Sequence, residues 1–178
     1  GGVTLLLFLK RLIMNKKQRR YEYRFITPKS DYYQSTVDLR YRVFYEPTNS
    51  PMSCVYDELE KDSQHLVALC DNKVVGYMRL TVKGGKGELT QLVVDESMRK
   101  KGVGHNLFGI LMDEANAQGV RRIDGMIRLP MEKFVKFFGF QVEDEIFPSP
   151  KTGIPHKRIS IDIPLQIPGC DSPRIKEK

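Results

Sequence analysis

Residues 91–115, QLVVDESMRKKGVGHNLFGILMDEA, limit the possible folds of this chain more than any other stretch. The apolar run up to Val94 predicts a buried strand. After the basic loop RKKGVG, apolar residues predict an amphipathic helix because they recur every four positions, at Val103, Leu107, Leu111 and Ala115. The first N–H groups of a helix lack partners and the helix dipole is positive there, so this order of elements predicts a site for a pyrophosphate.

Two common phosphate-binding loops do not match this stretch. The chain contains no G-x-x-x-x-G-K-[ST] sequence, which excludes a P-loop, and G-x-G-x-x-G fails because HNL follows Gly104. A tight glycine turn with solvated cations remains the alternative at this point.

Length and charge narrow the function classes. A chain of 178 residues is typical of one domain, and its net charge of +7 favours anionic partners. A nucleic-acid partner is disfavoured because the cations are scattered and no RNA-binding motif is present. The longest apolar run, residues 5–9, is far below the roughly 18 residues of a membrane span. The three cysteines form no C-x-x-C pair, so we expect reduced thiols, no cysteine-built zinc site and a cytoplasmic location.

The order of predicted elements defines the fold class. We expect strands at 21–27, 65–70, 74–82, 88–94, 122–128, 139–147 and 156–163, and helices at 31–45, 103–118 and 130–138. This order predicts an α/β (α+β) domain, with a mixed, mostly antiparallel central sheet flanked by helices on both faces. The domain is expected at 21–163. Residues 1–20 are an N-terminal extension or a remnant of cloning, and 164–178 form a C-terminal tail.

The context of R-x-x-G-x-G resembles the acetyl-CoA-binding motif of the GNAT (GCN5-related) N-acetyltransferases. HLVALCDNKVVGYMRL at 65–80 is similar to the central hairpin of that family, and FVKFFGF at 134–140 is similar to its F-Y-x-x-F-G-F segment. GIPH at 153–156 and VFYE at 43–46 resemble the ElaA-like branch. The resemblance covers almost the whole of 21–163.

The resemblance implies an N-acetyltransferase that moves an acetyl group from acetyl-CoA directly to a primary amine. The strand residues that would pair with the pantetheine arm are Leu92, Val93 and Val94. The residues that would surround the pyrophosphate are Arg99, Lys100, Lys101, Gly102, Val103, Gly104 and His105. A main-chain N–H near Val93 would stabilise the charge on the carbonyl oxygen.

The catalytic groups are less clearly indicated. A reacting amine must be neutral, and Glu88 is the candidate base, with Thr90 and Gln91 placing a water; a solvated carboxylate is the alternative. Val135 stands where the family has a tyrosine, and valine cannot donate a proton. Tyr77 is the candidate replacement and Tyr45 another, although both can be packing residues.

Arg128 and His156 are the candidate substrate-binding residues. Arg128 stands where the ElaA-like pattern has Gln, and it could contact cofactor phosphates, a substrate carboxylate or only solvent. His156 lies in a loop expected to border the substrate cleft. We predict no metal site, because no residues have metal-ligand spacing.

Other functions remain open. LRYRVFYEP at 39–47, ELEKD at 58–62 and VVGYMRL at 74–80 are also similar to acyl-homoserine-lactone and N-acyl amino acid synthases, which use a longer acyl donor. A non-catalytic CoA-binding sensor is a further alternative. The acceptor is a small-molecule or peptide amine, and a homodimer through the C-terminal strands is possible.

Overall fold

The computed structural model describes residues 21–163, so the predicted N-terminal segment and C-terminal tail lie outside the described residues. Residues 21–163 form an eight-stranded sheet of order β1-β2-β3-β4-β5-β8-β6, with β7 paired to β8. The strands are β1 Tyr21–Ile26, β2 Ser63–Cys70, β3 Lys73–Lys83, β4 Lys86–Val94, β5 Arg122–Arg128, β6 Gln141–Val142, β7 Phe147–Pro148 and β8 Pro155–Asp162. The β4–β5 pair is parallel and the other described pairs are antiparallel, which confirms the predicted mixed sheet.

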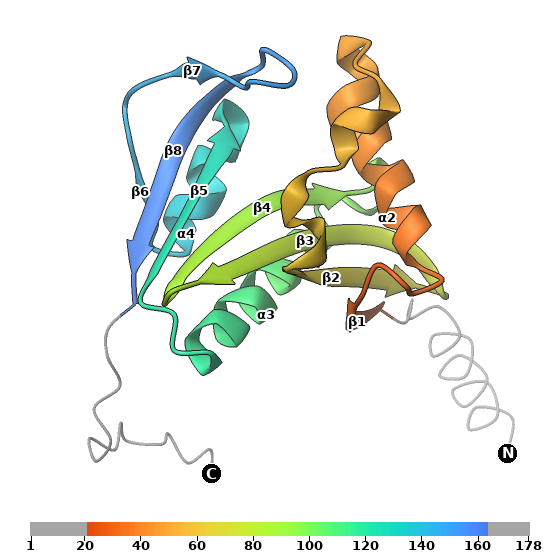
Figure 1. Cartoon of the computed structure of the whole chain (residues 1–178), viewed down its shortest axis with the longest axis horizontal. Helices are drawn as coiled ribbons and strands as arrows, with labels where there is room; N and C mark the ends of the chain where they lie inside the picture. Colours follow the sequence, from red (N-terminus) through yellow and green to blue (C-terminus); the bar gives the residue numbers. More distant parts are fainter. Residues whose placement is uncertain (1–20, 164–178) are drawn as a thin grey trace, which may run out of the picture.

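Helices cover both faces of the sheet, as predicted (Figure 1). The α-helices are α2 Tyr33–Arg40, α3 Val103–Ala117 and α4 Glu132–Phe137. A π-helical turn, Tyr41–Tyr45, continues α2, so the helix predicted at 31–45 is confirmed in extent but changes its winding. Short 3-10 helices lie at Glu46–Thr48, Met52–Val55, Glu58–Lys61, Glu96–Met98 and Leu129–Met131.

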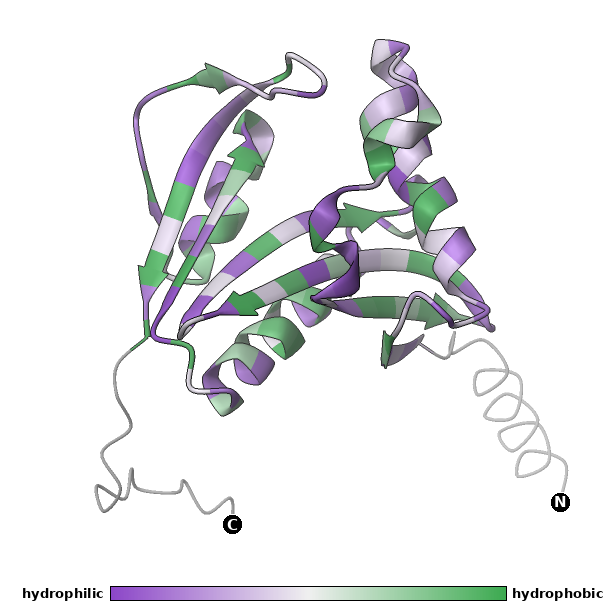
Figure 2. Cartoon of the chain, in the orientation of Figure 1, coloured by the Kyte–Doolittle hydropathy of each residue, from purple (hydrophilic) through white to green (hydrophobic). Residues whose placement is uncertain are grey.

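The hydrophobic core explains why helices pack on both faces of the sheet. Leu66 and Ala68 of β2 belong to the cluster under α3, whereas Val67 and Leu69 belong to the cluster on the α2 face. Because successive strand residues point to opposite faces and both faces are covered, β2 is apolar from Leu66 to Cys70. Bands of apolar and polar residues follow one another along other strands (Figure 2).

The turn between β2 and β3 has the geometry that its sequence predicts. Asp71 and Asn72 both have positive φ, 50° and 62°. This conformation matches the twist of two-residue hairpins, and Asp and Asn tolerate it better than most residues.

The strand predicted at 139–147 is wrong in its continuity. Only Gln141–Val142 and Phe147–Pro148 form strand pairs with β8, and of the residues between them Glu143 alone contacts it, through a main-chain hydrogen bond of its N–H to the Arg158 carbonyl at 2.9 Å. This interruption contains the consecutive acidic residues Glu143, Asp144 and Glu145, which are poor strand formers.

The strands β4 and β5 pair over only four residues and then separate. Their pairing ends at Leu89 and Gly125, so residues 90–94 of β4 and 126–128 of β5 border an open V, which we call the fork (Figure 1). On the other edge of β4 the register with β3 shifts between Tyr77 and Arg79, opposite Gln91, whose φ is 59°. This bulge changes which side chains face each side of the sheet.

The start of the fork requires a residue without a side chain. A Cβ added at Gly125 would lie 2.8 Å from the carbonyl oxygen of Leu89, which is main chain and cannot move aside cheaply. Glycine therefore lets β4 and β5 approach closely just before they diverge.

We predict that Gly125→Ala lowers the free energy of unfolding by about 1–3 kcal/mol, because the new methyl group overpacks this contact. Urea unfolding monitored by circular dichroism measures the change. Gly109→Ala in α3 is the matched control, since a Cβ there meets nothing within 4 Å, and it should not destabilise. Equal stability of the Gly125→Ala variant and the unchanged protein would contradict this account.

Candidate active site

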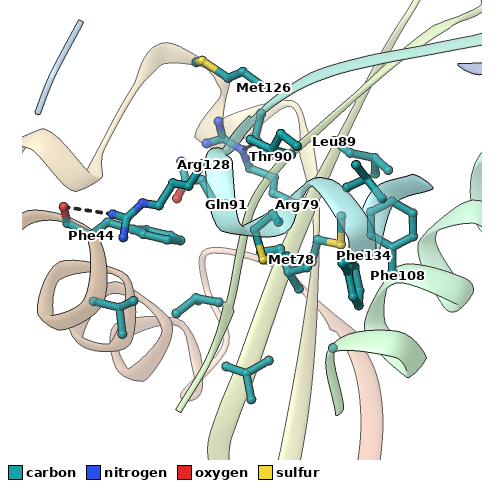
Figure 3. Close-up of a pocket in the computed structure, with 18 of the residues that line it drawn as sticks. Phe44, Met78, Arg79, Leu89, Thr90, Gln91, Phe108, Met126, Arg128 and Phe134 are labelled. Atoms are coloured by element: carbon teal, nitrogen blue, oxygen red, sulfur yellow. Dashed lines mark hydrogen bonds between the residues drawn. The ribbon is translucent and has the colours of Figure 1, made fainter. Parts of the chain in front are cut away.

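A cavity of about 820 Å³ occupies the fork. Its walls come from β4 and β5, the π-helical turn, the start of α3, α4 and the loop between β7 and β8 (Figure 3). Elements far apart in sequence therefore meet at the place where two neighbouring strands separate. A cavity of this volume is of the size that binds small molecules.

The start of α3, where the sequence predicts an anion site, lies at one end of the cavity. Gly102 precedes the helix in the left-handed conformation, with φ of 82°, and Lys100 also has positive φ. Asn106 N–H donates to the Gly102 carbonyl as the first helical hydrogen bond. The N–H groups of Val103, Gly104 and His105 precede it and have no acceptor within the helix, so they are available to an anion.

The side chains predicted to surround the pyrophosphate divide into two groups. Arg99, Lys100 and His105 line the cavity, and His105 also contacts the rings of Phe134, Phe137 and Phe138 in and beside α4. Lys101 is not among the residues that line the cavity, and its ammonium donates to the Ser97 carbonyl at 2.9 Å.

The predicted pantetheine strand lies along the fork. Leu92, Val93 and Val94 all line the cavity. Their side chains are taken up by packing, because Leu92 and Val94 pack on the α3 side and Val93 belongs to the α2-side cluster. What this strand offers a ligand is its main chain on the edge that β5 has left.

A buried charge network supports the other face of β4, and the sequence analysis did not identify it. Glu60 lies between two arginines, with Arg40 Nη1 at 2.7 Å and Arg79 Nη1 at 2.8 Å from its Oε1. Arg79 also pairs with Asp57 through two hydrogen bonds of 2.9 and 2.7 Å. Arg40 and Arg79 are almost completely buried. The signals that could have revealed it are an arginine within the apolar strand VVGYMRLTV and the acidic run DELEKD.

The same arginines hold the bulge of β4. Arg79 Nε donates to Thr90 Oγ1 at 3.1 Å, and Arg40 Nη1 donates to Gln91 Oε1 at 2.9 Å. Thr90 and Gln91 therefore both contact groups on the α2 face although they are neighbours in one strand. Each arginine thus links a carboxylate to the bulge of β4, where the alternation of side chains between the two faces of the sheet is interrupted.

The network keeps its carboxylates ionised. Burial alone would raise the pKa of Asp57 and Glu60, but hydrogen bonds and charge from Arg79 and Arg40 outweigh burial and hold both values below their ordinary range. Burial, together with donation of its hydroxyl to Glu60, raises the pKa of Tyr33 to about 12. Asp57 and Glu60 are consequently poor proton acceptors.

The predicted catalytic pair is not brought together. Glu88 is exposed and lines the cavity, in register with Asp124 of β5. Tyr77 is fully buried, is not among the residues that line the cavity, and its hydroxyl lies 2.7 Å from His65 Nδ1. Burial raises the pKa of Tyr77. The structure therefore places Tyr77 out of reach of a ligand, whereas Tyr45 does line the cavity.

The two predicted substrate residues lie side by side. Arg128 at the end of β5 is in register with His156 at the start of β8, and both line the cavity. The Arg128 guanidinium covers the Phe44 ring at 4.9 Å and donates to the Phe44 carbonyl at 3.5 Å (Figure 3). His156 Nδ1 donates to the Ile154 carbonyl at 2.7 Å. Val135 also lines the cavity, but it is a buried core residue.

The fold and this cavity define a class of protein with known relatives. The Acetyltransferase (GNAT) family matches residues 29–140, and the chain is 34% identical over 132 residues to the uncharacterized N-acetyltransferase YjcF of Bacillus subtilis, covering 70% of this chain and 88% of the relative. The chain therefore belongs to the acetyltransferase (GNAT) family and is an acyltransferase. The ElaA-like branch stays a prediction.

Solved structures share the fold. Escherichia coli ElaA superposes with a TM-score of 0.68 at 19% identity, covering 78% of this chain and 98% of that chain. An aminoglycoside 6'-N-acetyltransferase complexed with coenzyme A gives a TM-score of 0.64 at 16% identity, with 81% and 98% covered.

Two further observations concern the described part of the chain. No helix within residues 21–163 is both long and apolar enough to cross a membrane. The same residues contain no group of three or more His, Cys, Asp or Glu side chains that could hold a metal ion.

We predict that Glu60→Gln lowers the free energy of unfolding at pH 7 by about 3 kcal/mol, because it leaves Arg40 and Arg79 buried with one carboxylate fewer. The unchanged protein should lose this contribution as pH falls below about 4, since the unfolded carboxylates have pKa values near there and the folded values lie lower. Urea unfolding between about pH 3 and pH 7, a range that spans the pKa of about 4 of an unfolded carboxylate, measures both effects.

Glu22→Gln is the control for this prediction, because Glu22 forms an exposed pair with Arg24 and should change stability little. The interpretation fails when both glutamine variants lose the same small amount, or when the Glu60→Gln variant keeps the full acid dependence.

Proposed function

We propose that this chain is an acetyl-CoA-dependent N-acetyltransferase that moves the acetyl group directly to a primary amine. The observation that carries the proposal is that the open edge of β4 and the start of α3 border one cavity. An extended arm with amide groups can bind the first, and a pyrophosphate can bind the second. Acetyl-CoA carries both features and supplies the activated acetyl group as a thioester.

The donor-binding residues follow from this placement. N–H groups of Val103, Gly104 and His105 would bind the pyrophosphate, with Arg99 and Lys100 adding positive charge. Gly104 gives this anion site space, because a Cβ there would lie 3.7 Å from Val94 Cγ2 and 3.9 Å from the Phe134 ring, on the side of the cavity. The main chain of Leu92, Val93 and Val94 would pair with the pantetheine arm.

The transfer itself balances without a covalent enzyme intermediate. The neutral amine nitrogen forms a bond to the thioester carbon, the carbon–sulfur bond breaks, CoA leaves as a thiolate, and the nitrogen releases its extra proton to solvent. A main-chain N–H of β4 near Val93 would stabilise the negative charge on the carbonyl oxygen. An ordinary thiol has a pKa of about 8.5, so the thiolate can leave and take a proton from solvent. The transfer therefore does not require a tyrosine where Val135 stands.

Glu88 is the proposed base for the incoming ammonium group. Of the carboxylates that line the cavity, Asp57 is held by Arg79, whereas Glu88 forms no ion pair within the described residues. Its position on β4 before Thr90 and Gln91 suits proton transfer through a water.

We predict that Gly104→Val weakens acetyl-CoA binding at least about tenfold, because the branched side chain would fill the space beside the first N–H groups of α3. Isothermal titration calorimetry measures the dissociation constant. Gly109→Val, in the same helix with no atom within 4 Å of its Cβ, is the matched control and should bind as the unchanged protein does. Unchanged affinity of the Gly104→Val variant would argue against an anion site at α3.

We predict that Glu88→Gln lowers kcat about 100-fold and removes the acid limb of the pH–rate profile, where the rate rises with pH as the base ionises, while the affinity for acetyl-CoA stays the same. Thiol release from acetyl-CoA with an excess of amine measures the rate. Asp124→Asn is the control, because Asp124 lies in register with Glu88 but does not line the cavity. A pH–rate profile that Glu88→Gln leaves untouched would remove the base assignment.

A longer acyl donor is the second candidate. The three stretches that resemble N-acyl amino acid and acyl-homoserine-lactone synthases supply Arg40, Glu60 and Arg79, and the network brings these residues into contact. Mass spectrometry of the ligand that co-purifies distinguishes the donors: acetyl-CoA or CoA supports the first proposal, and a longer acyl species supports the second. A CoA-binding sensor would bind CoA and release no thiol with any amine.

A further inference from the structure

We propose that the acceptor amine carries a carboxylate group and that Arg128 binds this carboxylate. The inference rests on the proposed function and names the class of acceptor: an amino acid, or a peptide or other amine with a free carboxylate. It rests on the burial of Arg128 and on its lack of a carboxylate partner among the described residues, which together distinguish it from the other cations that line the cavity.

The other cations that line the cavity have partners or lie in solvent. Arg79 pairs with Asp57 and Glu60, and Arg99 faces Glu96 at 3.6 Å. Lys151 donates to the carbonyls of Cys54 and Tyr56, and Lys100 is exposed at the start of α3. Arg128 differs from all of these, because it is half-buried and no carboxylate of residues 21–163 lies within 4 Å of its nitrogens.

An unpaired, half-buried guanidinium is costly for the protein without a ligand. Burial lowers the pKa of Arg128, and the positive charge of Arg99 lowers it further. Among the described residues, this cost is offset by the Phe44 ring, by an electrostatic interaction with Tyr45 that raises the pKa of Arg128, and by one hydrogen bond to the Phe44 carbonyl, whose 3.5 Å length is at the limit for such a bond. An anion that enters the cavity would replace the missing counter-charge.

The geometry favours a carboxylate of the acceptor over a phosphate of the donor. The N–H groups that suit a phosphate lie at the start of α3, whereas Arg128 lies at the end of β5, against the π-helical turn (Figure 3). Phe44 covers one face of the guanidinium and leaves the planar edge with its N–H groups. Two parallel N–H donors match the two oxygens of a carboxylate.

His156 adds a second polar contact beside this site. Its Nδ1 must carry the hydrogen, because the Ile154 carbonyl can only accept, and in the neutral ring Nε2 then has a free lone pair. Paired residues on neighbouring strands have Cβ atoms roughly 5 Å apart. One ligand can therefore bind both residues, with its carboxylate on Arg128 and an N–H group that donates to His156 Nε2.

The test compares acceptors that differ only in the carboxylate. An equimolar mixture of the twenty common amino acids and the mixture of their methyl esters are each supplied with acetyl-CoA, and thiol release is measured. We expect kcat/KM for the acids to exceed that for the esters by roughly 10- to 100-fold, as for one bidentate charged contact. Arg128→Gln should reduce this ratio to about 1 and leave the KM for acetyl-CoA unchanged.

Arg158→Gln is the matched control. Arg158 lies on β8, covers an aromatic ring as Arg128 does, has no carboxylate partner within the described residues, and does not line the cavity. Its variant should keep the preference for acids.

Two results would overturn the inference alone: turnover of esters as fast as acids, or an Arg128→Gln variant that raises the KM for acetyl-CoA and keeps the preference. Acetyl-CoA binding by calorimetry with no turnover of either mixture, of carboxylate-bearing peptides or of a panel of simple amines would instead overturn the proposed transfer, and the carboxylate acceptor with it.

Discussion

The site depends on the separation of β4 from β5 beyond Leu89 and Gly125. A strand inside a sheet normally has both edges hydrogen-bonded, so a β-sheet offers a ligand little main chain. Here β4 and β5 pair for four residues and then diverge. Beyond that point β4 is paired with β3 along one edge, and its other edge is not paired with β5. The cavity follows from this divergence, because the start of α3 and the end of β5 face the space that opens.

A charge network holds this divergence in one shape. Arg40 and Arg79 contact Gln91 and Thr90, the residues at the bulge of β4, and Glu60 joins the two arginines. A buried charge network of this kind adds little stability over an apolar core, but it is costly to break. Its effect here is positional: it fixes which side chains of β4 point away from the fork and leaves the main chain at the open edge to a ligand.

The parts of the site that the sequence predicted depend on local spacing. The strand to Val94, the loop with Gly102 and Gly104 and the amphipathic α3 all follow from residues close together in the chain, and the structure has them where expected. Other predicted residues depend on the direction in which a side chain points. Tyr77 was a candidate proton donor, but its hydroxyl lies against His65 in the core, and the Lys101 ammonium donates to the Ser97 carbonyl and does not line the cavity. The network was missed because its acids and bases are about 20 residues apart and meet only across elements.

The sequence by itself determined the class of fold, the glycine-containing loop that opens α3 and the family resemblance, because hydrophobic periodicity and glycine placement act over a few residues. Only the tertiary structure decided which charged groups are neutralised and which remain available. Asp57 is held by Arg79, whereas Arg128, half-buried in the same cavity, has no carboxylate beside it among the described residues. The physical reason is that the cost of a buried charge depends on its neighbours in space, and strand order and register set those neighbours.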